Sequence, residues 1–120
     1  MRPKPRALTN DEKLELRRSL ERKEAELLAS VDAQSANISP VSPDASLGRL
    51  TRLDAIQQQQ MAKAQLANAQ QALTRVQQIL TSWDDAIAGL CRNCDDPIGY
   101  ERLMRVPESL ICMECLEDAG

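Results

Sequence analysis

Four cysteines near the end of the chain constrain its fold more than any other feature. They form two Cys-x2-Cys pairs, Cys91 with Cys94 and Cys112 with Cys115, separated by seventeen residues. A Cys-x2-Cys turn brings two sulfurs to ~3.7 Å, the separation that Zn–S bonds of ~2.3 Å require. The spacing therefore predicts one tetrahedral zinc ion bound by all four thiolates. Because no ligand position is left for water or substrate, the predicted zinc is structural.

Two other uses of paired cysteines fit the sequence less well. A disulfide framework would need an export signal, and residues 1–9 contain Pro3 and Pro5 and no apolar run. A thioredoxin-like redox pair would need a strand–helix–strand context, which the residues around Cys91 and Cys112 do not offer. We therefore expect metal-bound thiolates in a reduced, cytoplasmic setting.

The composition favours long helices over a broad globular core. The chain of 120 residues has one Trp, one Tyr, no Phe and no His, although aromatic side chains dominate the energetics of most cores. Ala, Leu and Gln are abundant instead, as in long helices. The absence of His and the closed metal site argue against an enzyme. No stretch approaches the ~20 apolar residues of a membrane span.

Charge is unevenly distributed along the chain, whose net charge is −3. Residues 1–30 carry eight Lys or Arg and six Asp or Glu, whereas residues 91–120 carry three and seven. Phosphate binding needs clustered Lys and Arg, and the predicted zinc centre adds a formal charge of about −2. We therefore expect no sequence-specific nucleic-acid binding and a protein partner with a basic surface.

A first helix and a loop are predicted before the cysteines. Residues 1–8 are basic and interrupted by proline, and we expect them to be disordered. Thr9-Asn10-Asp11-Glu12 has the pattern of a capping box and predicts a helix start. This helix should end near Ala33, and residues 34–47, which contain prolines and serines without periodicity, should form a loop.

The second predicted helix has the strongest apolar pattern in the chain. Its apolar residues alternate steps of three and four, which is typical of a coiled-coil heptad seam. The seam consists of Leu66, Ala69, Leu73, Val76, Leu80, Trp83, Ile87 and Leu90. The apolar face of residues 14–31 is the partner available within the chain, and dimerisation with another chain is the alternative.

The sequence thus predicts a mainly α fold: an antiparallel helical hairpin (coiled coil) over residues 9–90, then a small four-cysteine zinc finger over residues 91–120. Within the finger, Pro97-Ile98-Gly99 predicts a turn, and a short strand is expected around Tyr100 to Val106. The finger is too short to bury a stabilising core, so metal binding should supply most of its folding free energy.

The order of these features resembles the DksA/TraR family of bacterial transcription regulators. The specific match lies within residues 91–115, and the hairpin agrees in architecture over about residues 10–90. Between the cysteine pairs, the match rests on Pro97-Ile98-Gly99, Arg102-Leu103, Pro107 and Leu110-Ile111. The resemblance implies a monomer that binds RNA polymerase rather than DNA. The hairpin would enter the secondary channel, where acidic tip residues near the catalytic magnesium change the lifetime of promoter complexes.

The chain departs from the family pattern at the tip. The motif Asp-x-x-Asp-x-Ala does not occur, and the acidic candidates are Asp44 and Asp54, of which Asp54-Ala55 is the nearer match. Arg49 and Arg52 flank this pair. The alternative for Asp54 is an ordinary solvated helix residue.

The family also uses basic residues near the zinc module to hold guanosine tetraphosphate. At the equivalent places this chain has Val106 and Leu116, so Arg75 is the one candidate contact, whereas a polyphosphate needs converging cations. Five residues follow Cys115, so the C-terminal helix of longer members should be missing. The competing function is a zinc-stapled coiled-coil adaptor or oligomerisation module for another protein, which a stable dimer in solution would favour.

Overall fold

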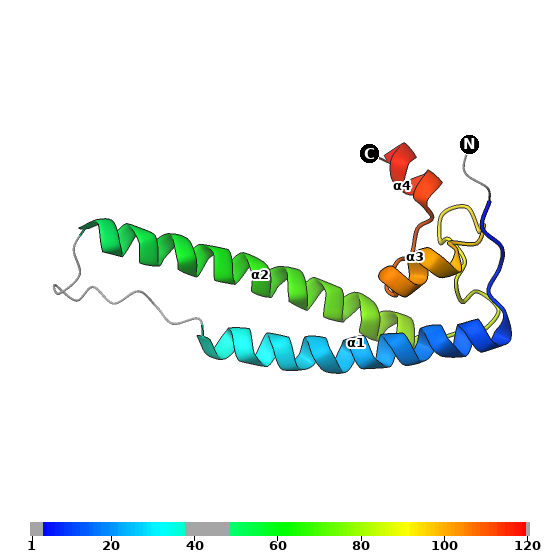
Figure 1. Cartoon of the computed structure of the whole chain (residues 1–120), viewed down its shortest axis with the longest axis horizontal. Coiled ribbons are helices and arrows are strands. Elements are labelled where there is room, and N and C mark those ends of the chain that lie inside the picture. Colours follow the sequence, from blue (N-terminus) through cyan, green and yellow to red (C-terminus); the bar gives the residue numbers. More distant parts are fainter. Residues whose placement is uncertain (1–3, 38–48, 120) are drawn as a thin grey trace. The chain divides into compact units, whose positions relative to one another are not determined.

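The computed structural model describes residues 4–37 and 49–119, and these residues form helices connected by turns. The helices are α1 (Asn10–Asn37), α2 (Arg49–Thr81), α3 (Tyr100–Arg105) and α4 (Met113–Ala119). The long helices α1 and α2 run in opposite directions and pack together (Figure 1). The prediction of a mainly α hairpin followed by a four-cysteine module is therefore confirmed. None of the described helices is long and apolar enough to span a membrane.

The chain divides into two compact units. The first combines Met1–Glu24 with Arg75–Gly120, and we call it the finger unit because it contains the cysteines. The second is Ala25–Thr74, which we call the hairpin unit. Both long helices continue from one unit into the other, so each unit contains a segment of α1 and a segment of α2.

The start of α1 is fixed by the predicted capping box. The backbone N–H of Glu12 donates to Thr9 Oγ1 at 3.2 Å, and the N–H of Thr9 donates to Glu12 Oε1 at 2.9 Å. These two bonds satisfy donors that a helix start otherwise leaves without partners.

The end of α1 lies beyond the predicted one. The helix continues through Asn37 rather than ending near Ala33, so the predicted loop is wrong for residues 34–37. The first proline in this region is Pro40, and the Gln34 side chain donates to Ser30 Oγ at 2.9 Å across one turn. Residues 38–47 of the predicted loop lie outside the described residues.

The core of the finger unit lies where α1, α2 and α3 supply apolar side chains. Leu16 and Leu20 are one turn apart on α1 and therefore share a face. Leu20 of α1 and Val76 of α2 are 0% exposed, and Leu103 of α3 is 1% exposed. Leu73, a seam residue of the hairpin unit, is also buried. The seam prediction thus identified buried positions of α2.

The seam prediction is wrong after Leu80, because α2 ends at Thr81. Ser82 Oγ donates to the Gln78 carbonyl at 2.7 Å, and Asp84 Oδ1 accepts the N–H of Ala86 at 2.9 Å. Short polar side chains that bond the nearby backbone in this way favour turns over continued helix.

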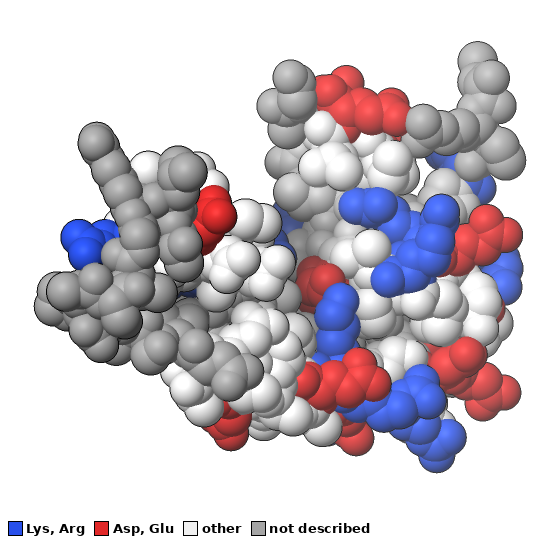
Figure 2. Space-filling view, turned by 60° about the vertical axis from the view of Figure 1, so that its left-hand side comes forward, with Lys and Arg blue, Asp and Glu red and all other residues white. Residues whose placement is uncertain are grey.

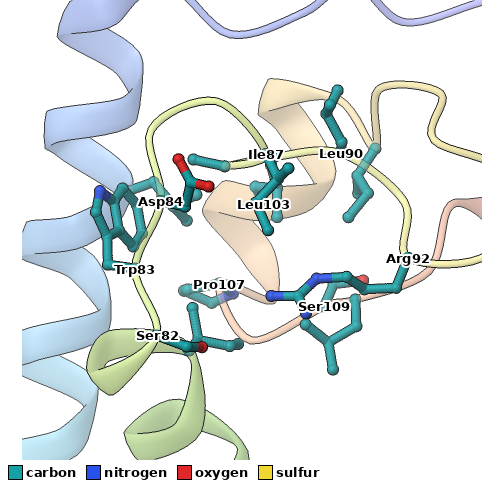
Figure 3. A pocket seen from close by; sticks show the side chains of 15 residues that line it. Ser82, Trp83, Asp84, Ile87, Leu90, Arg92, Leu103, Pro107 and Ser109 are labelled. Atoms are coloured by element: carbon teal, nitrogen blue, oxygen red, sulfur yellow. The ribbon is translucent and has the colours of Figure 1, made fainter.

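The last three seam residues lie in this turn region and not on a helix, and the Arg17 guanidinium of α1 lies 5.6 Å from the centroid of the Trp83 ring. Trp83, Ile87 and Leu90 line a small pocket of about 30 Å³ together with Leu103 and Pro107 (Figure 3). Such a space holds about one water molecule. The apolar residues therefore keep the spacing of three and four after α2 has ended, although they pack from turns and not from a helix.

The finger contains a helix where a strand was predicted. Tyr100–Arg105 forms α3, preceded by Gly99 with φ of 109°. The segment has no β-branched residue before Val106, and Glu101 in its first turn suits the helix dipole. The expectation of no C-terminal helix is also wrong, since the short α4 includes Cys115 and most of the residues after it.

Residues 4–8, part of the stretch expected to be disordered, contact the rest of the finger unit, while residues 1–3 lie outside the described residues. Leu8 is 8% exposed. Two nitrogens of Arg6 donate to the Glu12 carboxylate at 2.6 and 2.8 Å. This short segment is therefore part of the finger unit.

Candidate metal centre

The first cysteine pair lies in a tight backbone turn. The N–H of Cys91 donates to the Asp96 carbonyl at 2.7 Å, and the N–H of Asp95 donates to the Cys91 carbonyl at 3.0 Å. Asp95 has φ of 65°, a left-handed conformation that aspartate tolerates better than most residues. These bonds fold the loop so that Cys91 and Cys94 face the same point.

The second cysteine pair lies at the start of α4 and is tied to the first pair through the backbone. The N–H of Leu116 donates to the Cys112 carbonyl at 3.0 Å, the first bond of the α4 turn. The N–H of Arg92 donates to the Leu110 carbonyl at 2.8 Å, which brings the two cysteine segments side by side.

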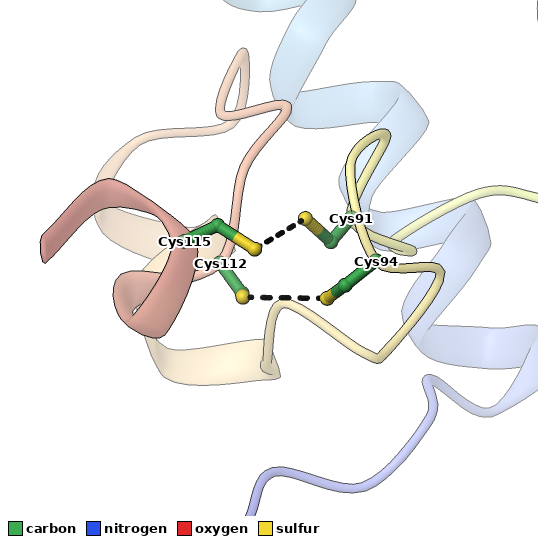
Figure 4. A group of neighbouring side chains, drawn as sticks. All are labelled: Cys91, Cys94, Cys112 and Cys115. Atoms are coloured by element: carbon green, nitrogen blue, oxygen red, sulfur yellow. Dashed lines mark hydrogen bonds between the residues drawn. The ribbon is translucent and has the colours of Figure 1, made fainter. Parts of the chain in front are cut away.

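The four sulfurs converge on one point (Figure 4). All lie within 4.8 Å of one another, with 3.8 Å between the Cys91 and Cys115 sulfurs and 3.7 Å between those of Cys94 and Cys112. A tetrahedron with Zn–S bonds of ~2.3 Å has sulfur–sulfur edges of about 3.8 Å. The four cysteines are thus positioned to bind one zinc ion, as predicted. Because every ligand is a cysteine, the ion stabilises the fold and has no open position for chemistry.

The thiols differ in acidity. Burial raises the pKa of Cys91, but backbone N–H groups of Cys112, Cys94 and Asn93 outweigh it and lower that pKa to about 6. The N–H of Asp96 acts to lower the pKa of Cys94, yet burial and the three neighbouring sulfurs raise it to about 12. Crowded thiols therefore resist ionising together, and a bound cation is what allows all four to be thiolates.

Asn93 is a residue of the centre that the sequence reasoning missed. Its backbone N–H donates to the Cys91 sulfur at 3.4 Å and its side-chain amide to the Cys115 sulfur at 3.3 Å. Such donors stabilise thiolate ligands and orient them. Its position between the cysteines of a Cys-x2-Cys turn was the available signal.

Polar contacts also attach the finger to α1, and none was predicted. Lys23 Nζ lies 2.7 Å from Glu108 Oε1 and 2.6 Å from Oε2, and Glu108 is only 8% exposed. The Tyr100 hydroxyl lies 2.9 and 3.0 Å from the two Glu15 carboxylate oxygens. Lys13 Nζ donates to the Asp85 carbonyl at 2.7 Å.

Three of the tip candidates, Arg52, Asp54 and Ala55, lie in the hairpin unit's part of α2. Asp54 and Arg52 are exposed and Ala55 is half-buried. Arg49 is the first residue of α2, and its side chain lies outside the described part of the chain, as does all of Asp44. Their predicted roles remain predictions.

The residues considered for a polyphosphate lie in the finger unit. Arg75 is exposed on α2, Leu116 is 45% exposed on α4, and Val106 is half-buried. A site for guanosine tetraphosphate at Arg75 remains a prediction.

Comparisons with known proteins agree with the resemblance. Residues 86–119 match the family model of the prokaryotic dksA/traR C4-type zinc finger. A solved structure, that of the transcription factor DksA2 from Pseudomonas aeruginosa, matches with a TM-score of 0.72 and 24% identity, covering 92% of this chain and 84% of that one. No curated protein matches the sequence significantly. The metal centre is thus a zinc finger of the DksA/TraR type, and the hairpin with its finger has the fold of DksA2.

Proposed function

We propose that this chain is a transcription regulator that binds RNA polymerase through the secondary channel. The hairpin tip would lie near the catalytic region and change the stability of promoter complexes without specific DNA binding. The observation that carries the proposal is the fold shared with a transcription factor over 92% of this chain. The dksA/traR-type finger within the same chain supports it.

The surface charge supports a protein partner over DNA. Lys and Arg are interspersed with Asp and Glu, and neither sign covers a continuous face in the view of Figure 2. The net charge of −3 disfavours a phosphate backbone further, since such binding depends on clustered cations.

Asp54 is the residue we propose to act at the tip. It is exposed close to the start of α2, with the exposed Arg52 nearby in sequence. A carboxylate near a catalytic magnesium ion acts through its charge, because metal ions and their bound water respond strongly to a nearby anion. Proton transfer by Asp54 is not needed for this role.

The test separates binding from regulation. Asp54→Asn removes the charge with little change in size, and we expect it to abolish the effect on promoter-complex lifetime. Affinity, measured by competition with a known secondary-channel factor, should stay within a few-fold, because the wider hairpin surface supplies most of the contact. Asp32→Asn, at an exposed position of α1, is the matched control and should regulate like wild type.

Three outcomes would change the proposal. Failure of the wild-type chain to compete for the channel would refute polymerase binding at that site. If Asp54→Asn regulates normally and Asp44→Asn does not, the active carboxylate is Asp44. If neither change matters, the chain does not act through tip acidity.

The second candidate is a zinc-stapled coiled-coil adaptor or oligomerisation module. Exposed apolar side chains in the hairpin unit favour it: Leu28, Leu53 and Met61 are 45%, 52% and 63% exposed. A partner helix could cover them. Light scattering decides between a monomer, which fits the polymerase proposal, and a stable dimer, which fits an oligomerisation module.

A further inference from the structure

Residues 4–8 form a short segment that we call the strap. Within the finger unit, the strap lies against residues 89–119, which carry the four cysteines and which we call the module. Leu8 is buried, and Arg6 is held at the start of α1 by the bidentate bond to Glu12. Glu12 also accepts the N–H of Thr9, so one carboxylate fixes both the strap and the helix start. The end of the strap next to α1 is thus fixed by Glu12.

Two glycines of the module contact the strap closely. A Cβ atom at Gly89 would lie 2.8 Å from Leu8 Cδ1, and a Cβ atom at Gly99 would lie 2.9 Å from Pro5 Cβ. Real Cβ atoms do not approach other carbons this closely. Both glycines also have positive φ, 82° and 109°. Both glycines are therefore in close contact with the strap, Gly89 with the end of the Leu8 side chain and Gly99 with the Pro5 ring.

Both glycines belong to the loop that carries the first cysteine pair. The N–H of Ile98 donates to the Gly89 carbonyl at 2.9 Å, and residues 90 and 97 form a β-bridge. Cys91 and Cys94 lie between the two glycines in sequence. Zinc binding to this pair closes the same loop that holds the glycines in register.

From this arrangement we propose that the strap is a zinc-dependent latch. With zinc bound, the loop presents Gly89 and Gly99 to Leu8 and Pro5, and the strap is seated. Without zinc, the loop loses the constraint that keeps the two glycines in place, and residues 4–8 leave the module while α1 stays helical. This property goes beyond the proposed function and does not depend on it.

Release of the strap would also remove one wall of a cleft. Lys4, Pro5 and Arg6 line a cavity of about 490 Å³ whose other walls are residues 96–99, α3 and the start of α4. The cleft exists in this form only while the strap is seated. Zinc occupancy would therefore control the shape of this surface of the finger unit.

Trypsin provides a direct probe of the latch. Arg2 and Lys4 are each followed by proline, which blocks trypsin, so Arg6–Ala7 is the one cleavable bond before Lys13. Mass spectrometry of the zinc-loaded full chain should show slow loss of residues 1–6. After zinc removal by a chelator, this cleavage should be at least about tenfold faster, because cleavage follows the population of the open form. Cleavage at Arg17, Arg18 and Arg22 within α1 should change much less.

A substitution in the strap tests the coupling from the other side. Leu8→Ala removes the side chain seated on Gly89, so at saturating zinc its Arg6–Ala7 bond should be cut about as fast as in the metal-free wild type. Linkage is reciprocal, so Leu8→Ala should also bind zinc more weakly in competition with a chelator. Leu14→Ala, at a position of α1 that is 49% exposed, is the matched control and should behave like wild type in both measurements.

The outcomes are distinct. Equal cleavage of Arg6–Ala7 with and without zinc overturns the latch. An equal acceleration at the α1 sites overturns it as well, because the unit would then unfold as a whole. Unchanged zinc affinity in Leu8→Ala overturns the coupling. None of these results bears on whether the hairpin binds polymerase.

Discussion

At the residue scale, Leu20 is one of the largest fully buried side chains of the finger unit. Its side chain is fully buried on α1. Leu20→Ala removes buried apolar volume and leaves a cavity, so we expect it to lower the free energy of unfolding by about 2–5 kcal/mol. Urea denaturation of the zinc-loaded protein measures this change. Leu14→Ala, on the same helix but 49% exposed, should change it by less than about 1 kcal/mol. Equal effects would mean that α1 is not packed through Leu20.

The contact between Arg6 and Glu12 makes the stability of the folded protein depend on pH. The Arg6 side chain and the N–H of Thr9 lower the pKa of Glu12 from 4.5 to about 2, against the opposing effect of burial. Because the pKa is lower in the folded protein, this contact contributes its full stability above pH 4.5. The contribution then fades as the pH falls towards 2.

The lowered pKa of Glu12 can be tested by following the NMR chemical shift of its carboxyl carbon as the pH changes. Between pH 7 and 4, in samples that retain zinc, the Glu12 signal should move far less than that of a glutamate with a pKa of 4.5. Arg6→Ala should restore most of the ordinary movement, whereas Arg105→Ala, which removes an exposed cation elsewhere in the unit, should not. An ordinary titration in wild type would show that Arg6 and Glu12 do not pair in solution.

At the element scale, the Lys23–Glu108 pair attaches α1 to the turn between α3 and α4. Lys23→Met leaves the Glu108 carboxylate buried without its cation, which should cost about 1–3 kcal/mol. Pairing it with Glu108→Leu removes the unpaired charge and should restore much of the loss. Urea denaturation of the two single variants and the double variant tests this. Additive losses would show that the two side chains do not interact.

An element could be predicted from the sequence where the interactions that form it join residues close together in the chain. The Thr9–Glu12 capping box and the Cys-x2-Cys turns are set by residues within a few positions of each other, and both appear in the structure as predicted. The end of α2 was missed because the spacing of Ile87 and Leu90 fits a helix as well as a turn packed on the finger.

The strap could not be predicted because its cause is not local. Proline and basic residues suggested disorder, whereas Leu8 is buried by Gly89, which lies far along the chain. Lys23 and Glu108 are a similar case, since nothing in the sequence near either residue points to the other. Their pairing depends on how the finger folds onto α1.

At the scale of the whole molecule, the division into two units predicts that loss of zinc and unfolding of the hairpin unit are separate events. All four cysteines lie within the finger unit, while most of α2 and the second half of α1 belong to the hairpin unit. A small metal module without a large core depends on its ion for folding, whereas paired helices depend on their apolar contacts. Loss of zinc should therefore melt the finger and leave much of the helix content.

The single Trp allows the two units to be followed separately. Trp83 belongs to the finger unit, where the Arg17 guanidinium lies 5.6 Å from its ring centroid. We expect a chelator to shift Trp83 fluorescence while far-UV circular dichroism keeps most of its helical signal. Cys112→Ser should show the same pattern without a chelator, and Ser109→Ala, which leaves every metal ligand in place, should resemble zinc-loaded wild type. Coincident loss of both signals would mean that the chain unfolds as one unit, because two probes of a single two-state transition must agree.

This separation rests on the metal assignment, which elemental analysis tests directly. We expect about one zinc per wild-type chain purified under reducing conditions, and the absence of zinc would refute the assignment.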